Sequence, residues 1–236
     1  MPKRREFLLG AAVLGWLGSA CSKPRRVVSS VHAGVEFKEL IHKEPDESLP
    51  IVVAIHGLGG APEHWVDGWT AFAGRARIVL PRGFERHEEG FSWFPWTANM
   101  KDPKLAADVS AAEERLWKGI AELAGQRRVV VAGFTQGAIL SLVMASRHPD
   151  IVGAFPVVGA CPEALLPKAR AAPVVAYHGT ADEVLPIQVT RDAINAFKQQ
   201  GNGAILREYP GVRHTATDAM HADLDADMQK ALQGKI

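Results

Sequence analysis

The sequence predicts an α/β protein with a mostly parallel central sheet and helices on both faces. Short runs of β-branched and apolar residues, each of strand length, alternate along the chain with longer segments that have helical periodicity. Several of these runs are apolar at every position, which is typical of strands covered on both faces of a parallel sheet. No internal repeat or low-complexity tract interrupts this alternation.

The first half of the chain is expected to form three strands and a helix. Apolar and polar residues alternate loosely at 31–41, which indicates an edge strand. The fully apolar run at 51–55 predicts a central strand, and a shorter strand at 77–80 is stopped by Pro81. A helix is expected at 105–123, because small and apolar residues recur there along one stripe.

The second half alternates more regularly, and the same reasoning applies to each segment. Apolar runs predict strands at 129–132, 151–158, 173–177 and 204–209. Helical patterns occupy the segments that follow them, at 138–147, from Pro186 to near Gly201, and at 216–232. Strands and helices in this order favour parallel pairing with right-handed crossovers.

The first 20 residues resemble an export signal rather than a part of the fold. Three basic residues at 3–5 precede an uncharged apolar stretch at 7–20 that is too short for a stable membrane anchor. Arg4-Arg5 followed by Phe7-Leu8 resembles a twin-arginine signal. The end of the stretch resembles a bacterial lipobox, in which Cys21 is lipidated, although the leucine lies one place further from the cysteine than usual.

This interpretation divides the chain into a signal peptide at 1–20, a basic polar tether at 22–30 and a single domain at 31–236. Export predicts a periplasmic protein or a membrane-anchored lipoprotein, with membrane contact only through a lipid on Cys21. That lipid would leave Cys161 as the only thiol, which is expected to be a small buried side chain.

The net charge and the composition limit the classes of partner that are expected. Loss of the signal peptide removes three basic residues and one acidic residue, so the formal net charge of +1 becomes −1. A nearly neutral chain does not indicate a nucleic-acid partner. His64, His87 and His148 lack paired ligands at metal spacing, and neither a metal nor another cofactor is expected.

The most informative motif is Gly133-Phe134-Thr135-Gln136-Gly137, directly after an apolar run. It has the layout of a nucleophile elbow, G-x-S-x-G, with threonine in place of serine. The elbow residue needs a positive backbone dihedral, and the two glycines lack the Cβ atoms that would collide with neighbouring chain. The backbone N–H of Gln136 opens the next helix and is expected to face a developing oxyanion.

Three further loops follow other strands of the predicted sheet. Asp182 comes after the strand at 173–177, and His214 comes after the strand at 204–209. A glycine-rich loop follows the strand at 51–55, and there the N–H of Leu58 is expected to be a second oxyanion donor. Because chemistry in such sheets collects at the carboxyl ends of the strands, Thr135, Asp182 and His214 are expected to form a nucleophile, acid and base.

With these loops and the elbow, the sequence resembles the phospholipase/carboxylesterase family of α/β-hydrolases, which includes acyl-protein thioesterases. The resemblance extends from about Ile51 to His214. Its motifs are His56-Gly57-Leu58-Gly59, Pro81-Arg82-Gly83, Ser92-Trp93-Phe94, the elbow, His178-Gly179 through Pro186, and His214. It implies an α/β-hydrolase fold in which the elbow residue, here Thr135, attacks an ester or thioester carbonyl.

Each chosen residue has a rival. Glu183 is an alternative acid to Asp182, and His221 is the nearest competitor of His214. His56 is expected to be a hydrogen-bonding loop residue. The aromatic segment at 91–96 is expected to line an acyl or alcohol pocket, chiefly through Trp93 and Phe94, with core packing as the alternative. Asp223, Asp225 and Asp227 mimic a calcium loop, but their helical pattern predicts a solvated helix face.

These observations lead to a hypothesis and two alternatives. The hypothesis is an exported carboxylic ester hydrolase that acts on small-molecule or cell-envelope esters and uses Thr135, with activity attenuated by the methyl group of threonine. One alternative is an inactive hydrolase-fold protein that binds a ligand or a partner. The other keeps threonine as a bystander while His214 activates a water molecule.

Overall fold

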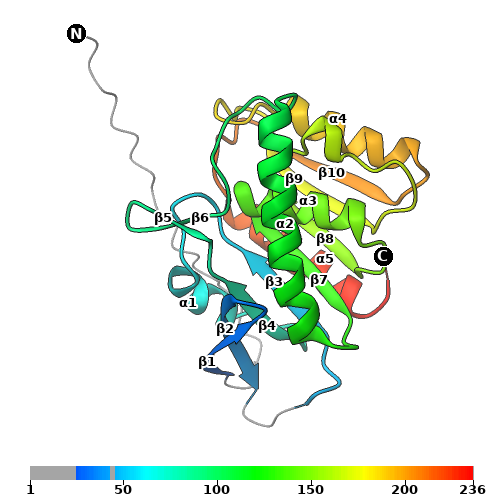
Figure 1. Ribbon diagram of the computed structural model, residues 1–236. Helices are drawn as coiled ribbons and strands as arrows, with labels where there is room; N and C mark the ends of the chain where they lie inside the picture. The colour runs from blue at the N-terminus through cyan, green and yellow to red at the C-terminus, as the bar shows by residue number, and fades with distance from the viewer. Residues whose placement is uncertain (1–24, 43–45, 236) are drawn as a thin grey trace.

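The computed structural model describes residues 25–42 and 46–235 and contains an eight-stranded mixed sheet (Figure 1). β1 and β2 form an antiparallel hairpin, β2 pairs antiparallel with β4, and every remaining pair is parallel. The predicted α/β class is therefore confirmed. In sheet order the strands are β1 (Arg25–His32), β2 (Val35–His42), β4 (Arg77–Pro81), β3 (Ile51–Ile55), β7 (Val129–Phe134), β8 (Gly153–Val157), β9 (Val174–Gly179) and β10 (Ala204–Tyr209).

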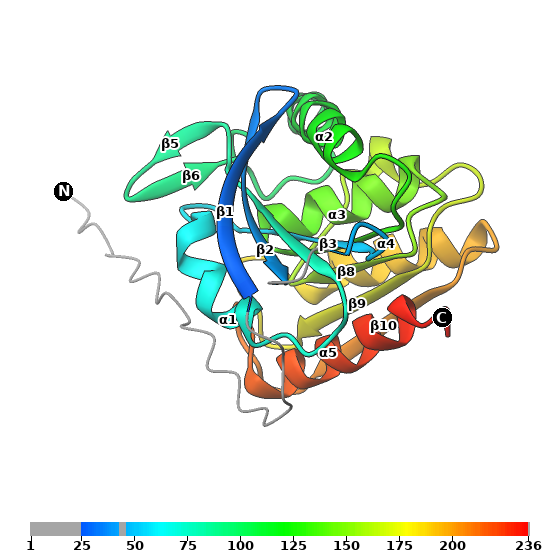
Figure 2. The same ribbon diagram turned by 90° about the horizontal axis from the view of Figure 1, so that it is seen from below.

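Helices cover both faces of the sheet (Figure 2). One face carries α2 (Pro103–Ala124), α3 (Gln136–Arg147) and α4 (Ile187–Gln199), and the other carries α1 (Val66–Thr70) and α5 (Asp218–Leu232). A small hairpin of β5 (Glu85–His87) and β6 (Gly90–Ser92) lies apart from the main sheet, and two 3₁₀ turns occupy Pro62–Trp65 and Glu163–Leu165. No helix within the described ranges is long and apolar enough to cross a membrane.

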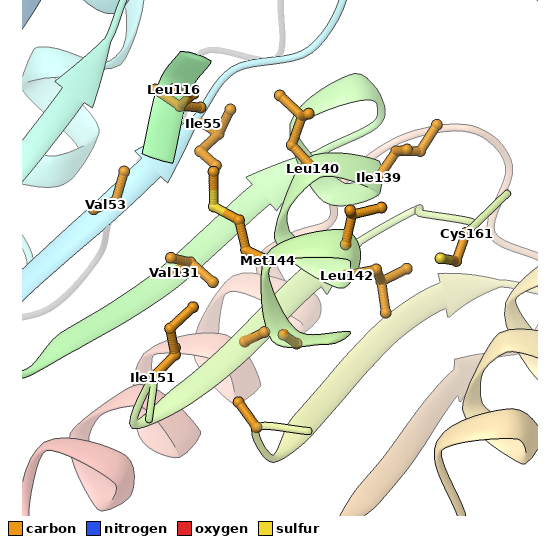
Figure 3. Packing of buried hydrophobic residues seen from close by; sticks show 14 of the residues in the cluster. Val53, Ile55, Leu116, Val131, Ile139, Leu140, Leu142, Met144, Ile151 and Cys161 are labelled. Atoms are coloured by element: carbon orange, nitrogen blue, oxygen red, sulfur yellow. The ribbon is translucent and has the colours of Figure 1, made fainter. Parts of the chain in front are cut away.

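The core has two layers, one on each face of the sheet. In the layer shown in Figure 3, Ile139, Leu140 and Met144 of α3 pack against Val53 and Val131 of the central strands. α3 is buried on nearly every side because α2 covers the face that it turns away from the sheet. This burial fixes the helix that follows the elbow, and therefore fixes the elbow itself.

Cys161 belongs to the same layer, as predicted for a small buried side chain. Burial raises the pKa of its thiol to about 12, so the thiol is inert at neutral pH.

The N-terminal boundary of the domain differs from the prediction. Residues 25–30, expected to belong to a tether, are part of β1, and the strand expected at 31–41 is broken at Ala33 and Gly34, whose φ angles are 45° and 74°. β1 pairs through its backbone along the whole of β2, while Val27 and Val31 stay exposed. An exposed edge strand needs no apolar pattern, so its sequence resembles a linker. The predicted signal peptide and Cys21 lie outside the described residues.

The prediction of a solvated face is wrong for Asp223 and Asp227, whose carboxylates accept hydrogen bonds from strand residues, whereas the half-buried Asp225 accepts from Gln229 on the same helix. Asp227 is only 4% exposed and accepts hydrogen bonds from Tyr177 Oη (3.0 Å) and Arg207 Nε (2.8 Å). Asp223 accepts from the hydroxyl of Tyr209 at 2.7 Å. The partners come from β9 and β10, so only the tertiary fold reveals why α5 carries acids on its inner side.

Candidate active site

Thr135 occupies a strained turn between β7 and α3. Its φ of 47° and ψ of −107° lie outside the regions that β-branched residues favour. A Cβ on Gly133 would lie 2.2 Å from the backbone of Gly137, and a Cβ on Gly137 would lie 2.0 Å from the carbonyl oxygen of Ile55. The predicted steric need for glycine on both sides of the elbow is therefore confirmed. The half-buried Thr135 side chain stands at the carboxyl end of a central strand.

Asp182 and His214 are brought together from two different loops. His214 Nδ1 donates to Asp182 Oδ2 at 2.8 Å, and the imidazole is 20% exposed. The other carboxylate oxygen, Oδ1, accepts from the N–H groups of Val184 (2.9 Å) and Leu185 (2.8 Å). The carboxylate is therefore fixed from both sides, which suits a group that orients a histidine.

The hydrogen bonds of Asp182 also control its charge. Burial, the largest influence, raises the pKa of Asp182. Hydrogen bonds from His178, His214 and the Leu185 N–H outweigh this effect and hold the pKa well below its ordinary range. Asp182 is therefore ionised at neutral pH, and its negative charge faces His214.

The rival residues lie elsewhere. Glu183 is exposed and faces Arg213 at 3.2 Å. His221 lies on α5, and burial lowers its pKa. Neither is bound to the Asp182–His214 pair in the part of the chain that the structure describes.

The hydroxyl of Thr135 faces the loop after β3. A Cβ built on Gly57 would lie 2.4 Å from Thr135 Oγ1, so the hydroxyl occupies the space beside that glycine. The ring of Phe134, the neighbour of Thr135, lies 6.0 Å from the His214 ring, measured between centroids. Among the described residues, no hydrogen bond joins Thr135 Oγ1 to His214. Asp182 and His214 are thus joined to each other, and the Thr135 hydroxyl faces the loop that contains Gly57.

The backbone around the predicted oxyanion donor Leu58 is held on both sides. His56, buried, donates from Nδ1 to the Gly57 carbonyl at 2.7 Å, and its Nε2 accepts from Gly83 N–H at 3.0 Å. Burial lowers the pKa of His56 to about 4, so the ring is neutral, as these opposite roles require. His56 is therefore the predicted hydrogen-bonding loop residue.

The β5–β6 hairpin continues this support. Gly59 N–H donates to the Phe91 carbonyl and Phe91 N–H donates to the Gly60 carbonyl, each at 2.9 Å. The second predicted donor, the N–H of Gln136, begins α3 directly after Thr135. Both predicted oxyanion donors therefore stand on backbone that is fixed by its neighbours.

Trp93 and Phe94 do not have the role that the sequence predicted. Their side chains are 2% and 1% exposed and belong to the core, so they offer almost no surface to a ligand. Their main chain binds the side chain of Gln136, whose Oε1 accepts from Trp93 N–H (3.0 Å) and whose Nε2 donates to the Phe94 carbonyl (2.8 Å). Trp93 Nε1 also donates to the carbonyl of His56 at 2.8 Å. The segment positions the two oxyanion loops instead.

Sequence reasoning assigned no role to His178 or Thr190, both fully buried behind Asp182. In the sequence, His178 is marked only as part of a His-Gly pair that follows a predicted strand. Thr190, eight residues beyond Asp182 on α4, leaves no local signal, because only the packing of α4 against β9 brings it to that histidine. Within the described ranges, no three His, Cys, Asp or Glu side chains group as a metal site.

The sheet, the elbow and the Asp182–His214 pair define an α/β-hydrolase scaffold. A sequence profile described as Phospholipase/Carboxylesterase matches residues 37–232. The chain therefore belongs to the phospholipase/carboxylesterase family, a family of esterase-type hydrolases.

Individual relatives are distant. NocK of Nocardia uniformis subsp. tsuyamanensis, which is named as an esterase, is 30% identical over 151 residues. That match spans 59% of this chain and less than half of NocK, 42%. Acyl-protein thioesterase 1 of Kluyveromyces lactis is 25% identical over 215 residues, 78% of this chain and 92% of that protein. The structure of Zea mays acyl-protein thioesterase 2 has a TM-score of 0.70 at 17% identity, covering 83% of this chain and 98% of that one, and shows the shared fold.

Proposed function

We propose that the protein is an exported carboxylic ester hydrolase in which Thr135 is the nucleophile, His214 the general base and Asp182 the acid that orients it. The observation that carries this proposal is the 2.8 Å bond between His214 Nδ1 and an ionised Asp182, next to an elbow that presents a hydroxyl. A fixed carboxylate–imidazole pair beside a hydroxyl is the arrangement that activates a weak nucleophile.

The reaction has two halves. Thr135 Oγ1 attacks the carbonyl carbon and its proton passes to His214 Nε2, while the N–H groups of Leu58 and Gln136 stabilise the oxyanion. The tetrahedral intermediate collapses, and the leaving alcohol takes the proton from His214. Water then attacks the acyl-threonine, gives a proton to His214 and releases the carboxylic acid, and Thr135 Oγ1 recovers that proton.

Threonine makes the first half slower than serine would. Its hydroxyl lies beside Gly57 and forms no hydrogen bond to His214 among the described residues, so Oγ1 must move before His214 can take its proton. β-branching restricts χ1 to few positions, and each productive rotamer leaves the methyl group near the incoming carbonyl. We therefore expect low kcat values and a preference for short, unhindered acyl groups.

Kinetics of three proteins test this proposal: wild type, Thr135→Ala and Thr135→Ser, with short-chain p-nitrophenyl esters. Loss of the hydroxyl is expected to lower kcat/KM by at least a hundredfold, because members of such a triad act as a unit. Thr135→Ser is expected to be faster than wild type. A wild type no faster than Thr135→Ala refutes the covalent mechanism on these substrates.

The same experiment addresses the two rivals. Hydrolysis that survives in Thr135→Ala and disappears in His214→Ala supports attack by a water molecule. A silent wild type with an active Thr135→Ser variant supports an altered site that binds a ligand or partner without turnover.

The location is proposed from the sequence alone. An exported chain meets small carboxylic esters or envelope esters rather than lipidated cytosolic proteins, so we do not extend the thioesterase names of its relatives to protein deacylation. Globomycin blocks removal of the signal peptide from lipoprotein precursors, so treatment of expressing cells is expected to make a heavier, membrane-bound precursor accumulate in place of the mature chain that begins at Cys21. A mature chain that is unmodified at Cys21 contradicts lipidation.

A further inference from the structure

A second histidine contacts the carboxylate that orients His214. His178 is the penultimate residue of β9, four residues before Asp182, and is 0% exposed. Its Nε2 lies 2.9 Å from the carbonyl oxygen of Leu185 and 3.2 Å from Asp182 Oδ2. Both neighbours are hydrogen-bond acceptors, so Nε2 carries a hydrogen and is shared between them.

This contact holds Asp182 in two ways. It binds Oδ2 directly, on the same oxygen that accepts from His214 Nδ1. It also binds the carbonyl of Leu185, whose own N–H donates to Asp182 Oδ1 at 2.8 Å. With the N–H of Val184, the carboxylate accepts from four donors, two on each oxygen. His178 is therefore a part of the loop that fixes the acid.

The ring of His178 is itself fixed from α4. Thr190 Oγ1 lies 2.7 Å from His178 Nδ1 and also contacts the carbonyl oxygen of Gly159, two residues after β8. Because the ring hydrogen is on Nε2, Nδ1 and this carbonyl are both acceptors and share the single hydroxyl hydrogen of Thr190. Thr190 is fully buried, so no water competes for this contact. In the sheet, the register partner of His178 on β10 is Glu208, which is paired with Arg191 at 2.6 Å.

We propose that His178 is a positioning residue of the hydrolytic site, which holds Asp182 against His214 and limits how strongly that carboxylate stabilises the protonated imidazole. The catalytic consequence rests on the proposed function. A second donor on Oδ2 spreads the negative charge that His214 would otherwise meet alone.

Two substitutions separate this role from simple packing. His178→Leu removes the donor and keeps an apolar side chain, whereas His178→Gln returns an amide N–H near the place of Nε2. In His178→Leu the two backbone N–H groups still bind Asp182 Oδ1, and Oδ2 accepts a hydrogen bond from His214 alone. The acid limb of the kcat/KM profile is expected to move up by about 0.5 to 1 pH unit, and kcat at neutral pH to fall about tenfold. KM should change little, and His178→Gln should recover both quantities.

The test uses the full-length protein labelled with ¹⁵N-histidine. Long-range ¹H–¹⁵N spectra across pH 4–9 report the hydrogen on His178 Nε2 and the pH at which His214 titrates, in wild type and both variants. Hydrogen on Nε2 in wild type and a higher titration point for His214 in His178→Leu support the proposal. A bare Nε2, or a folded His178→Leu with unchanged His214 titration and kcat, overturns it.

This design distinguishes the two levels of inference. If wild type hydrolyses no ester, the proposed function fails, while the NMR titration still decides whether His178 acts on Asp182. If His178→Leu does not fold, the near-isosteric Thr190→Val replaces it, since it removes the contact that fixes the ring. A smaller upward movement of the His214 titration is then expected, and no movement overturns the proposal.

Discussion

Replacing the elbow residue by glycine should make the protein more stable and less active. Thr135 has a φ of 47° and a ψ of −107°, a conformation that costs a β-branched residue about 1–3 kcal/mol. Glycine adopts positive φ without that cost, but it loses about 0.5–1 kcal/mol in chain entropy. The half-buried Thr135 side chain contributes little packing that could offset the gain.

The expected net effect of Thr135→Gly is a gain of about 1 kcal/mol in the free energy of unfolding, which corresponds to a rise in Tm of about 2–4 °C for a domain of this size. Scanning calorimetry and urea titration measure it. Thr215→Gly is the matched control, because Thr215 is half-buried and its φ is not positive. The control should lose stability by about 0.5–1 kcal/mol. A Tm of Thr135→Gly at or below that of wild type would refute the reasoning from strain.

Three further predictions follow from other contacts. Gly57→Ala should destabilise the wild type by about 1–3 kcal/mol, because its Cβ would lie 2.4 Å from Thr135 Oγ1. In a double-mutant cycle, Thr135→Ala should recover much of that loss. Additive effects of the two substitutions would contradict the position of Thr135 Oγ1 beside Gly57. Asp227→Asn should cost about 2–4 kcal/mol in urea titrations, since this buried carboxylate accepts from the buried Tyr177 and from the partly exposed Arg207. Asp225→Asn on the same helix should be neutral or stabilising, because burial raises the pKa of Asp225 and its Oδ1 has no hydrogen-bond partner among the described residues. Equal losses in the two variants contradict this contrast. The pKa of Asp182 is lowered on folding, so the ionised carboxylate stabilises the protein at neutral pH, and this stabilisation is lost as the pH falls below about 4. Asp182→Asn should therefore flatten the dependence of the free energy of unfolding on acidic pH. An unchanged pH profile of stability contradicts this prediction.

The fold was predictable because its central strands carry their own signal. The runs at β3, β7 and β9 are apolar at almost every position, and the carboxyl ends of parallel strands converge without further information. Loops after β9 and β10 therefore had to bring Asp182 and His214 to one edge. The glycines of the elbow were predictable from sterics alone.

Other features depend on contacts that a sequence pattern does not encode. β1 is held by backbone pairing, so its polar residues resemble a linker. Trp93 is aromatic and follows a strand, which fits a pocket wall as well as the core that it occupies. Asp227 and His178 are buried beside partners far away in the sequence, and their polarity alone suggests solvent. In each case the deciding partner lies on another element of the fold.

The central claim is that Thr135 forms a covalent intermediate, and trapping that intermediate tests it most directly. The full-length protein is treated with an alkyl fluorophosphonate, in which Oγ1 attacks phosphorus and fluoride leaves, and the tryptic peptide 129–147 is sequenced by tandem mass spectrometry. We predict one phosphonyl group on Thr135, absent from Thr135→Ala and strongly reduced in His214→Ala. An unlabelled Thr135 in a sample that hydrolyses esters as fast as its Thr135→Ala variant would contradict the claim.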